Sequence, residues 1–186
     1  MKTFLKLFVI TLLWSTLMTP ANTADAQTDV VDPENQLVLE LTTGTVKIQM
    51  LPEKAPKHVE RIKKLAKEDF YDNVVFHRVI EGFMAQTGDP TGTGRGGSEY
   101  PDIPAEFNDV NFDRGTVGMA RTQDPDSANS QFFICFDDCS FLNGQYTVWG
   151  EVTEGMEHID SLARGEPPAN PDMIVEAKLG TEMEAE

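Results

Sequence analysis

The fold of this chain is decided by the stretch Phe76-His77-Arg78-Val79-Ile80-Glu81-Gly82-Phe83-Met84-Ala85-Gln86. The stretch follows directly on the apolar residues Val74 and Val75, and a short apolar run between turn residues predicts a β-strand. Because neighbouring side chains of a strand point to opposite faces, His77 and Arg78 are expected on different sides of a sheet. We interpret His77 as a structural residue whose polar contacts are satisfied.

Patterns on both sides of this stretch predict a mainly β protein. Alternating apolar residues over 37–41 and 46–50, with Thr43-Gly44 between them, predict a β-hairpin. Further short apolar runs predict strands at 116–119, 131–134, 147–149 and 173–179. Apolar residues at helical spacing predict one helix from Pro56 to Lys67 and another through Met156, Ile159, Leu162 and Ala163. Since no βαβ alternation occurs, an antiparallel barrel is favoured over a doubly wound sheet.

The N-terminus has the order of a secretory signal peptide. Lys2 and Lys6 precede an apolar run from Leu7 to Met18, and Ala24-Asp25-Ala26 follows. The run is shorter than the about 20 apolar residues that span a bilayer, so we predict cleavage after Ala26 rather than an uncleaved anchor. The protein is then exported, periplasmic in a Gram-negative bacterium and secreted otherwise, with no membrane association after cleavage. The expected divisions are a signal peptide (1–26), a flexible leader (27–35), one domain (36–180) and an acidic tail (181–186).

Charge and cysteine content narrow the partners. The formal net charge of the 186 residues is −16 and no basic cluster occurs in the sequence, which argues against a nucleic-acid partner. The same charge favours a soluble, self-repelling monomer. Export permits a disulfide between Cys135 and Cys139, but their four-residue spacing favours neither a disulfide nor a zinc site.

Several motifs resemble sites for other kinds of chemistry, but each lacks a feature that such a site requires. The run Gly92-Thr93-Gly94-Arg95-Gly96-Gly97 has dinucleotide-binding spacing, but Pro101 and Pro104 prevent the helix that should follow, so we interpret it as a flexible surface loop. Asp124 and Asp126 lack the later ligands of a calcium loop. His58 and His158 fall on the two predicted helices and are interpreted as solvated residues. No metal, cofactor or hydrolytic centre is predicted.

The deciding stretch resembles the cyclophilin family of peptidyl-prolyl cis/trans isomerases, and the likeness continues to Gly88-Asp89. Three later motifs reinforce it: Met119-Ala120-Arg121, Ser130-Gln131-Phe132-Phe133-Ile134, and Phe141-Leu142-Asn143-Gly144 before Tyr146. The order of elements from Leu37 to Leu179 is also similar to the family. This resemblance implies an eight-stranded antiparallel closed β-barrel capped by two α-helices, with a substrate groove on its outer face.

The resemblance also implies roles for particular residues. Arg78 takes the catalytic position, and Gln86 orients Arg78 or holds the peptide backbone. The implied proline pocket consists of Phe83, Met84, Phe133 and Leu142. The implied peptide groove consists of Gln86, Ala120, Arg121 and Gln131. The implied rim consists of Phe141 and Tyr146. Adjacent Phe132 and Phe133 must point to opposite faces of their strand, so one can be core while the other lines the pocket. The implied partners are proline-containing polypeptides, including unfolded or folding exported proteins.

Two departures from the family pattern carry further expectations. Phe141 stands where members that bind cyclosporin tightly carry Trp, and Phe141 lacks an indole N–H donor, so weak cyclosporin binding is expected. Arg121 lies in a run that is similar to bacterial members, which agrees with a bacterial export signal.

Three hypotheses remain at this point. The first is an isomerase for exported proteins, the second a proline-peptide binding module or chaperone with incidental turnover, and the third a β-barrel without a groove function. Turnover of a proline tetrapeptide distinguishes them.

Overall fold

The computed structural model describes residues 32–183. The expected signal peptide, most of the expected leader and the last three residues lie outside the described residues. The last residues of the leader, Pro33–Asn35, form a 3₁₀ turn capped by the carboxylate of Asp32. Within the described part of the chain, no helix is long and apolar enough to cross a membrane.

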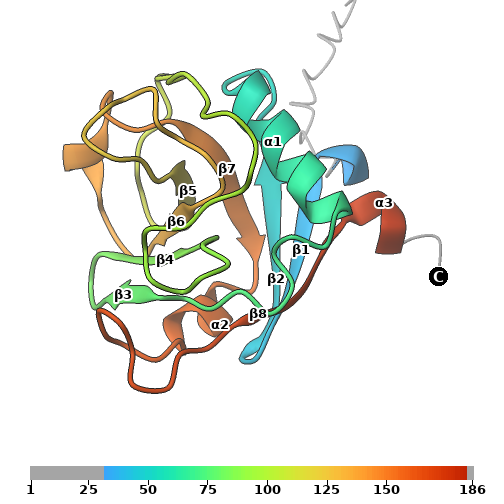
Figure 1. Cartoon of the computed structure of the whole chain (residues 1–186), viewed down its shortest axis with the longest axis vertical. Coiled ribbons are helices and arrows are strands. Elements are labelled where there is room, and N and C mark those ends of the chain that lie inside the picture. The colour runs from blue at the N-terminus through green and yellow to red at the C-terminus, as the bar shows by residue number, and fades with distance from the viewer. Residues whose placement is uncertain (1–31, 184–186) are drawn as a thin grey trace, which may run out of the picture. The chain divides into compact units, whose positions relative to one another are not determined.

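One antiparallel sheet of eight strands dominates the domain (Figure 1). Its spatial order is β3-β4-β6-β5-β7-β2-β1-β8. The strands are β1 (Gln36–Leu41), β2 (Gly44–Met50), β3 (Arg78–Ile80), β4 (Met84–Thr87), β5 (Thr116–Met119), β6 (Phe132–Cys135), β7 (Val148–Glu154) and β8 (Ile174–Leu179). The β1–β2 hairpin is confirmed, with Leu41 paired to Gly44 at the turn.

The expected closed barrel is only partly matched, because the sheet curls into a half-barrel whose edge strands β3 and β8 share no ladder. The gap is spanned by two isolated bridges, Val75 to Met173 and Val79 to Gly165. The expected strand at 74–76 is therefore only a single bridge. The chain leading into β8 carries Pro167, Pro168 and Pro171, which have no N–H to donate to a ladder.

Three helices accompany the sheet in the described residues. The predicted α1 (Pro56–Lys67) is confirmed to the residue, while α2 (Met156–Asp160) ends earlier than its apolar pattern suggests. These two lie at opposite ends of the curled sheet (Figure 1). A third short helix, α3 (Gly180–Met183), extends into the expected acidic tail, where the Glu182 carboxylate accepts the N–H of Leu179 at 2.8 Å.

Apolar side chains form two clusters, one on each face of strands β4 and β6. Val79, Ala85 and Ile134 belong to the large interior cluster, whereas Met84 and Phe133 belong to a smaller outer cluster. Phe132 joins the interior cluster and contacts the Trp149 ring edge-on, with ring centroids 5.4 Å apart. The expected division of Phe132 and Phe133 between opposite faces is thus confirmed.

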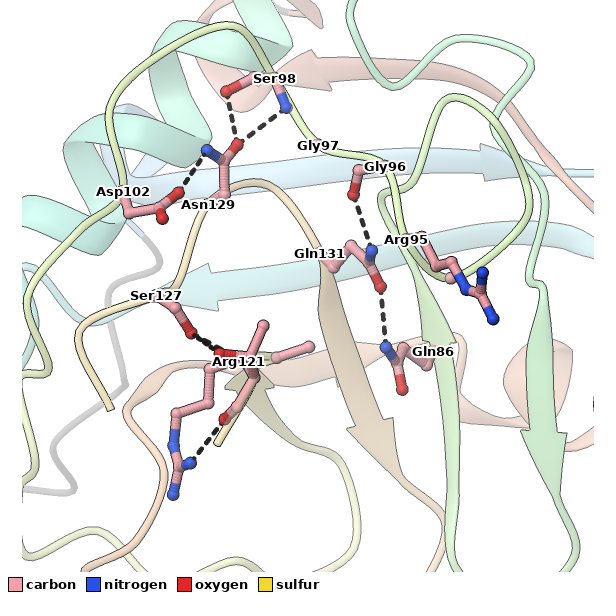
Figure 2. A pocket seen from close by; sticks show the side chains of 13 residues that line it. Gln86, Arg95, Gly96, Gly97, Ser98, Asp102, Arg121, Ser127, Asn129 and Gln131 are labelled. Carbon is pink, nitrogen blue, oxygen red and sulfur yellow. Dashed lines mark hydrogen bonds between the residues drawn. The ribbon is translucent and has the colours of Figure 1, made fainter. Parts of the chain in front are cut away.

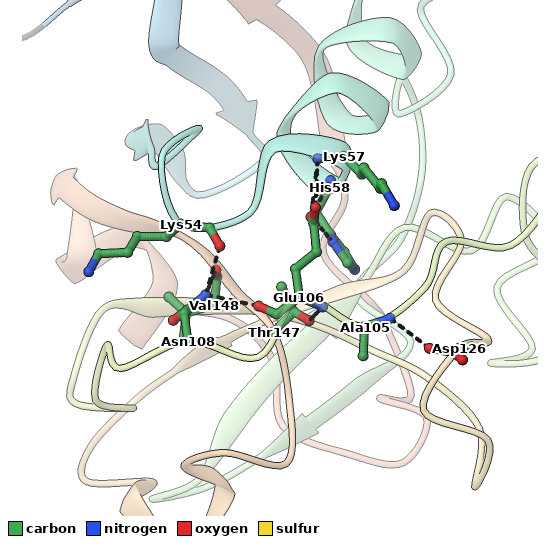
Figure 3. A network of polar contacts seen from close by, with 9 residues as sticks. All are labelled: Lys54, Lys57, His58, Ala105, Glu106, Asn108, Asp126, Thr147 and Val148. Atoms are coloured by element: carbon green, nitrogen blue, oxygen red, sulfur yellow. Dashed lines mark hydrogen bonds and ion pairs between the residues drawn. The ribbon is translucent and has the colours of Figure 1, made fainter.

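The expectation of a solvated His58 is wrong. His58 is 0% exposed, and its Nδ1 lies 2.7 Å from a carboxylate oxygen of Glu106 (Figure 3). The same carboxylate accepts the backbone N–H groups of Lys57 and His58 in the first turn of α1, where helical N–H groups lack intrahelical partners. His58 shares the buried face of the helix with Ile62 and Leu65, a spacing that could have indicated its burial.

Candidate active site

Arg78, Gln86 and Phe133 form a row across three strands of the outer face. Arg78 of β3 lies directly opposite Gln86 of β4, and Gln86 lies opposite Phe133 of β6. Side chains of directly opposed residues share one face of an antiparallel sheet. The next residue of the row, on β5, is Gly118, where a Cβ would lie 2.5 Å from the ring of Phe133 and 2.5 Å from that of Phe112. The glycine therefore lets the two rings stack across the floor of the site, with centroids 5.6 Å apart.

Above this floor lies a cavity of about 150 Å³. Nine of the expected site residues line it: Arg78, Phe83, Met84, Gln86, Ala120, Arg121, Phe133, Leu142 and Tyr146. The sequence motifs that supply them are far apart in the chain, so the sheet register brings them together. The cavity combines an apolar wall with two arginines, Arg78 and Arg121.

The guanidinium of Arg78 is held by two contacts. Its Nε donates to Oε2 of Glu166 at 2.8 Å, and its Nη1 lies 3.9 Å from the sulfur of Met84. The amide of Gln86 donates instead to Oε1 of Gln131 at 2.9 Å. Of the two roles expected for Gln86, orienting Arg78 is thus not supported by a hydrogen bond.

A second cavity, of about 470 Å³, continues from the first and shares Gln86, Ala120 and Arg121 with it (Figure 2). Gln131 lines this second cavity and donates its amide to the backbone oxygen of Gly96 at 2.8 Å. The two cavities together form a groove along the outer face. An extended peptide could occupy both.

The glycine-rich loop beside the groove is organised around Asp89, contrary to the expectation of a flexible surface loop. Asp89 is 0% exposed, and its carboxylate accepts backbone N–H groups of Thr91, Thr93, Arg95 and Gly96. Burial raises the pKa of this carboxyl, but the hydroxyl of Thr91 and the backbone donors outweigh burial, so the net pKa is well below the ordinary value. The loop thus has a charged centre that fixes its backbone.

His77 lies beneath this loop and is buried, as expected for a structural residue. Neither ring nitrogen has a hydrogen-bond partner among the described residues, so the expectation of a satisfied histidine is wrong. A Cβ on Gly94 would contact its ring at 3.4 Å, which places the ring against the loop. Burial lowers the pKa of His77 and favours the neutral ring.

The rim of the groove is aromatic and basic. The guanidinium of Arg121 lies 4.4 Å from the centroid of the Tyr146 ring and donates to the backbone oxygen of Gln145. Phe141 is 62% exposed and contacts the Phe83 ring at a centroid distance of 5.3 Å, but it lines neither cavity. Phe141, which was expected on the rim, therefore lies beside the pocket, whereas its sequence neighbour Leu142 lines the pocket.

Cys135 and Cys139 are free, buried thiols in the outer cluster. The thiol of Cys139 donates to the backbone oxygen of Phe83 at 3.4 Å. Burial raises the pKa of both thiols, which disfavours the reactive thiolate. Among the described residues, no group of His, Cys, Asp and Glu side chains is arranged to hold a metal ion.

Sequence reasoning missed Glu166. It follows α2 and is far from the deciding stretch in sequence. It lies in an irregular segment, between Gly165 and the pair Pro167-Pro168. Nothing in that pattern indicates contact with a residue 88 positions earlier.

Comparisons with known proteins agree with this architecture. The family model of the cyclophilin type peptidyl-prolyl cis-trans isomerases matches residues 37–179. A probable peptidyl-prolyl cis-trans isomerase of Brucella suis biovar 1 (strain 1330) is 52% identical over 164 residues, which cover 80% of this chain and 84% of that protein. The crystal structure of a cyclophilin from Hirschia baltica is similar with a TM-score of 0.75 at 32% identity, covering 80% of this chain and 75% of that one.

A cyclophilin type isomerase of Cryptosporidium parvum, crystallised in the presence of the dipeptide Ala-Pro, is similar with a TM-score of 0.73 at 28% identity, covering 77% of this chain and 98% of that one. Fold and groove thus define a curled antiparallel β protein with an apolar pocket beside an arginine on its outer face. The chain belongs to the family of cyclophilin-type peptidyl-prolyl cis-trans isomerases.

Proposed function

We propose that Arg78 accelerates rotation about the bond that precedes proline by donating a hydrogen bond to the twisted prolyl nitrogen. That bond resists rotation by about 18–20 kcal/mol because the nitrogen lone pair is delocalised into the carbonyl. At such a barrier, rotation occurs roughly once per minute or more slowly. When the bond is twisted, the lone pair returns to nitrogen, which then accepts a hydrogen bond. A donor at this position favours the transition state over the planar ground states.

The observation that carries the proposal is that Arg78 lines the same small cavity as Phe83, Met84 and Phe133. The apolar wall can hold the pyrrolidine ring while the preceding carbonyl rotates, and it excludes water from the rotating bond. The guanidinium is permanently charged and presents several N–H donors in one plane. No proton transfer or covalent intermediate is needed.

We propose further that the protein acts on exported polypeptides as they fold, as a monomer. The signal-peptide pattern and the high negative charge support this proposal. N-terminal sequencing of the mature protein should begin at Gln27, and an intact Met1 would contradict export with cleavage.

The test is cis-to-trans conversion of a proline tetrapeptide by the wild type, Arg78→Ala and Arg78→Lys. We expect Arg78→Ala to lower kcat/KM about 100- to 1,000-fold, as the loss of one transition-state donor does. Arg78→Lys keeps the charge but loses the planar fork, so it should recover only a small part of the activity.

Arg114→Ala is the matched control, since Arg114 is also a partly exposed arginine in an ion pair, with Asp160, and lines neither groove cavity. Wild-type turnover in Arg78→Ala would contradict the proposal. Peptide binding without turnover in the wild type would favour the binding-module alternative.

A further inference from the structure

We propose that Glu166 is a positioning residue for the isomerase reaction, because it holds the Arg78 guanidinium in the orientation that presents donors to the proline pocket. The inference rests on the proposed role of Arg78. It assigns to Glu166 the orienting role that sequence reasoning considered for Gln86.

The backbone places Glu166 beside Arg78. The N–H of Val79 donates to the oxygen of Gly165 at 2.8 Å, and the N–H of Gly165 donates back to Val79 at 2.9 Å. This reciprocal pair is an antiparallel bridge, so the residue after Gly165 stands opposite the residue before Val79. Glu166 therefore extends the row of Arg78, Gln86 and Phe133 by one position on the same face.

Gly165 makes this arrangement possible. Its φ is +150°, and a Cβ there would lie 2.6 Å from the Cα of Pro168. Only glycine tolerates both conditions. The segment is therefore fixed close to β3 directly before Glu166.

The carboxylate of Glu166 contacts Nε of Arg78 at 2.8 Å and leaves the other end of the guanidinium toward the cavity. Because the guanidinium is planar, an anchored Nε–H together with the Nη1 contact to Met84 fixes the direction of the remaining donors. Without the anchor, the side chain of Arg78, which is 38% exposed, can sample other rotamers. A misplaced donor loses transition-state stabilisation much more than substrate binding.

Stability does not account for the ion pair. The side chains of Arg78 and Glu166 are 38% and 54% exposed, and ion pairs at such exposure contribute little to folding stability. Replacing Glu166 should therefore change turnover more than the thermal midpoint. This difference separates a positioning role from a structural one.

The experiment compares kcat and KM of the wild type, Glu166→Ala, Glu166→Gln, Arg78→Ala and the double variant Arg78→Ala/Glu166→Ala on a proline tetrapeptide. We expect Glu166→Ala to lower kcat about 10-fold with KM changed less than about 2-fold. Glu166→Gln retains an acceptor oxygen, so it should lower kcat only about 3-fold. In the Arg78→Ala background, removal of Glu166 should have no further effect.

Glu81→Ala is the matched control, since Glu81 forms an ion pair with Arg164, two residues before Glu166, and among the described residues makes no hydrogen bond or ion pair with Arg78. It should leave kcat unchanged. In ¹⁵N-labelled protein, the Nε–H resonance of Arg78, assigned by its loss in Arg78→Lys, should move in Glu166→Ala and stay in place in Glu81→Ala.

The outcomes separate the two claims. Wild-type turnover in Arg78→Ala removes the proposed function and this inference with it. If Arg78→Ala is inactive but Glu166→Ala keeps kcat within about 2-fold of the wild type, only this inference fails. The inference also fails if Glu81→Ala lowers kcat as much as Glu166→Ala does, or if the Arg78 resonance does not move in Glu166→Ala. If Glu166→Ala does not fold, the same comparisons are made with Glu166→Gln.

Discussion

Phe141 illustrates how one residue can belong to a family motif and yet remain outside the cavity. Its ring is mostly exposed and packs in a tilted orientation against Phe83, a residue that lines the pocket. It presents an apolar surface but no donor at the position where tight cyclosporin binders carry Trp. Weak cyclosporin binding therefore stays a prediction with a simple test.

Phe141→Trp should increase the affinity for cyclosporin about 3- to 10-fold, because the indole N–H adds one hydrogen bond worth about 1 kcal/mol. Isothermal titration calorimetry of both proteins measures the change. The exposed Phe107, replaced by Trp, controls for added aromatic surface and should leave the affinity unchanged. Tight binding by the wild type would refute the prediction.

At the scale of elements, the loop after β4 depends on one buried carboxylate rather than on a regular backbone ladder. Four backbone N–H groups of the loop converge on Asp89, and Gly96 comes so close that a Cβ would lie 2.1 Å from its Oδ1. The same loop supplies the backbone oxygen of Gly96, which accepts a hydrogen bond from the Gln131 amide in the second cavity. Loss of the carboxylate charge should therefore loosen one wall of the groove.

Asp89→Asn should destabilise the protein by about 2–4 kcal/mol, because the amide cannot accept at both atoms and places N–H groups against donors. Urea unfolding measures the loss, and hydrogen exchange should accelerate at Thr93, Arg95 and Gly96. Asp102→Asn is the control from the same loop, since within residues 32–183 Asp102 accepts a single hydrogen bond, from the side-chain amide of Asn129. Unchanged protection in Asp89→Asn would show that the loop is held by other contacts.

At the scale of the whole molecule, buried histidines link stability to pH. Burial lowers the pKa of His58, despite the neighbouring Glu106 carboxylate that acts in the opposite direction, and burial also lowers the pKa of His77. In the unfolded chain both rings titrate near the ordinary value of about 6.5. Below that pH the unfolded state binds more protons than the folded state, so stability is full above about pH 6.5 and falls as the pH decreases.

Replacing His77 with leucine should reduce this dependence, because one of the two titrating rings is removed. Each ring accounts for a loss of up to about 1.4 kcal/mol per pH unit below its unfolded pKa. His77→Leu should also be as stable as the wild type at pH 7.5 or more stable, since an apolar side chain of similar volume replaces two unpartnered nitrogens. Thermal midpoints between pH 7.5 and 5.5 measure both effects. If the thermal midpoint of His77→Leu falls with pH as steeply as that of the wild type, His77 does not contribute to the pH dependence of stability.

The sequence by itself determined most of the elements and most of the groove. Alternation set the β1–β2 hairpin, helical spacing set α1, and the opposed faces of Phe132 and Phe133 followed from strand geometry alone. These features depend on the period of side chains along a local backbone, which a sequence encodes directly. The motif resemblance then grouped all nine residues that line the smaller cavity.

Only the tertiary structure decided how the sheet edges meet and which groups hold the site in place. The half-barrel, the burial of His58, the donors around Asp89 and the contact of Glu166 with Arg78 all depend on chain segments brought together after long or irregular connections. No periodicity specifies such contacts, because they arise from backbone paths that glycines and prolines set. The stretch from Phe76 to Gln86 thus contains the arginine that we propose to be catalytic, and the fold places the carboxylate of Glu166 beside it.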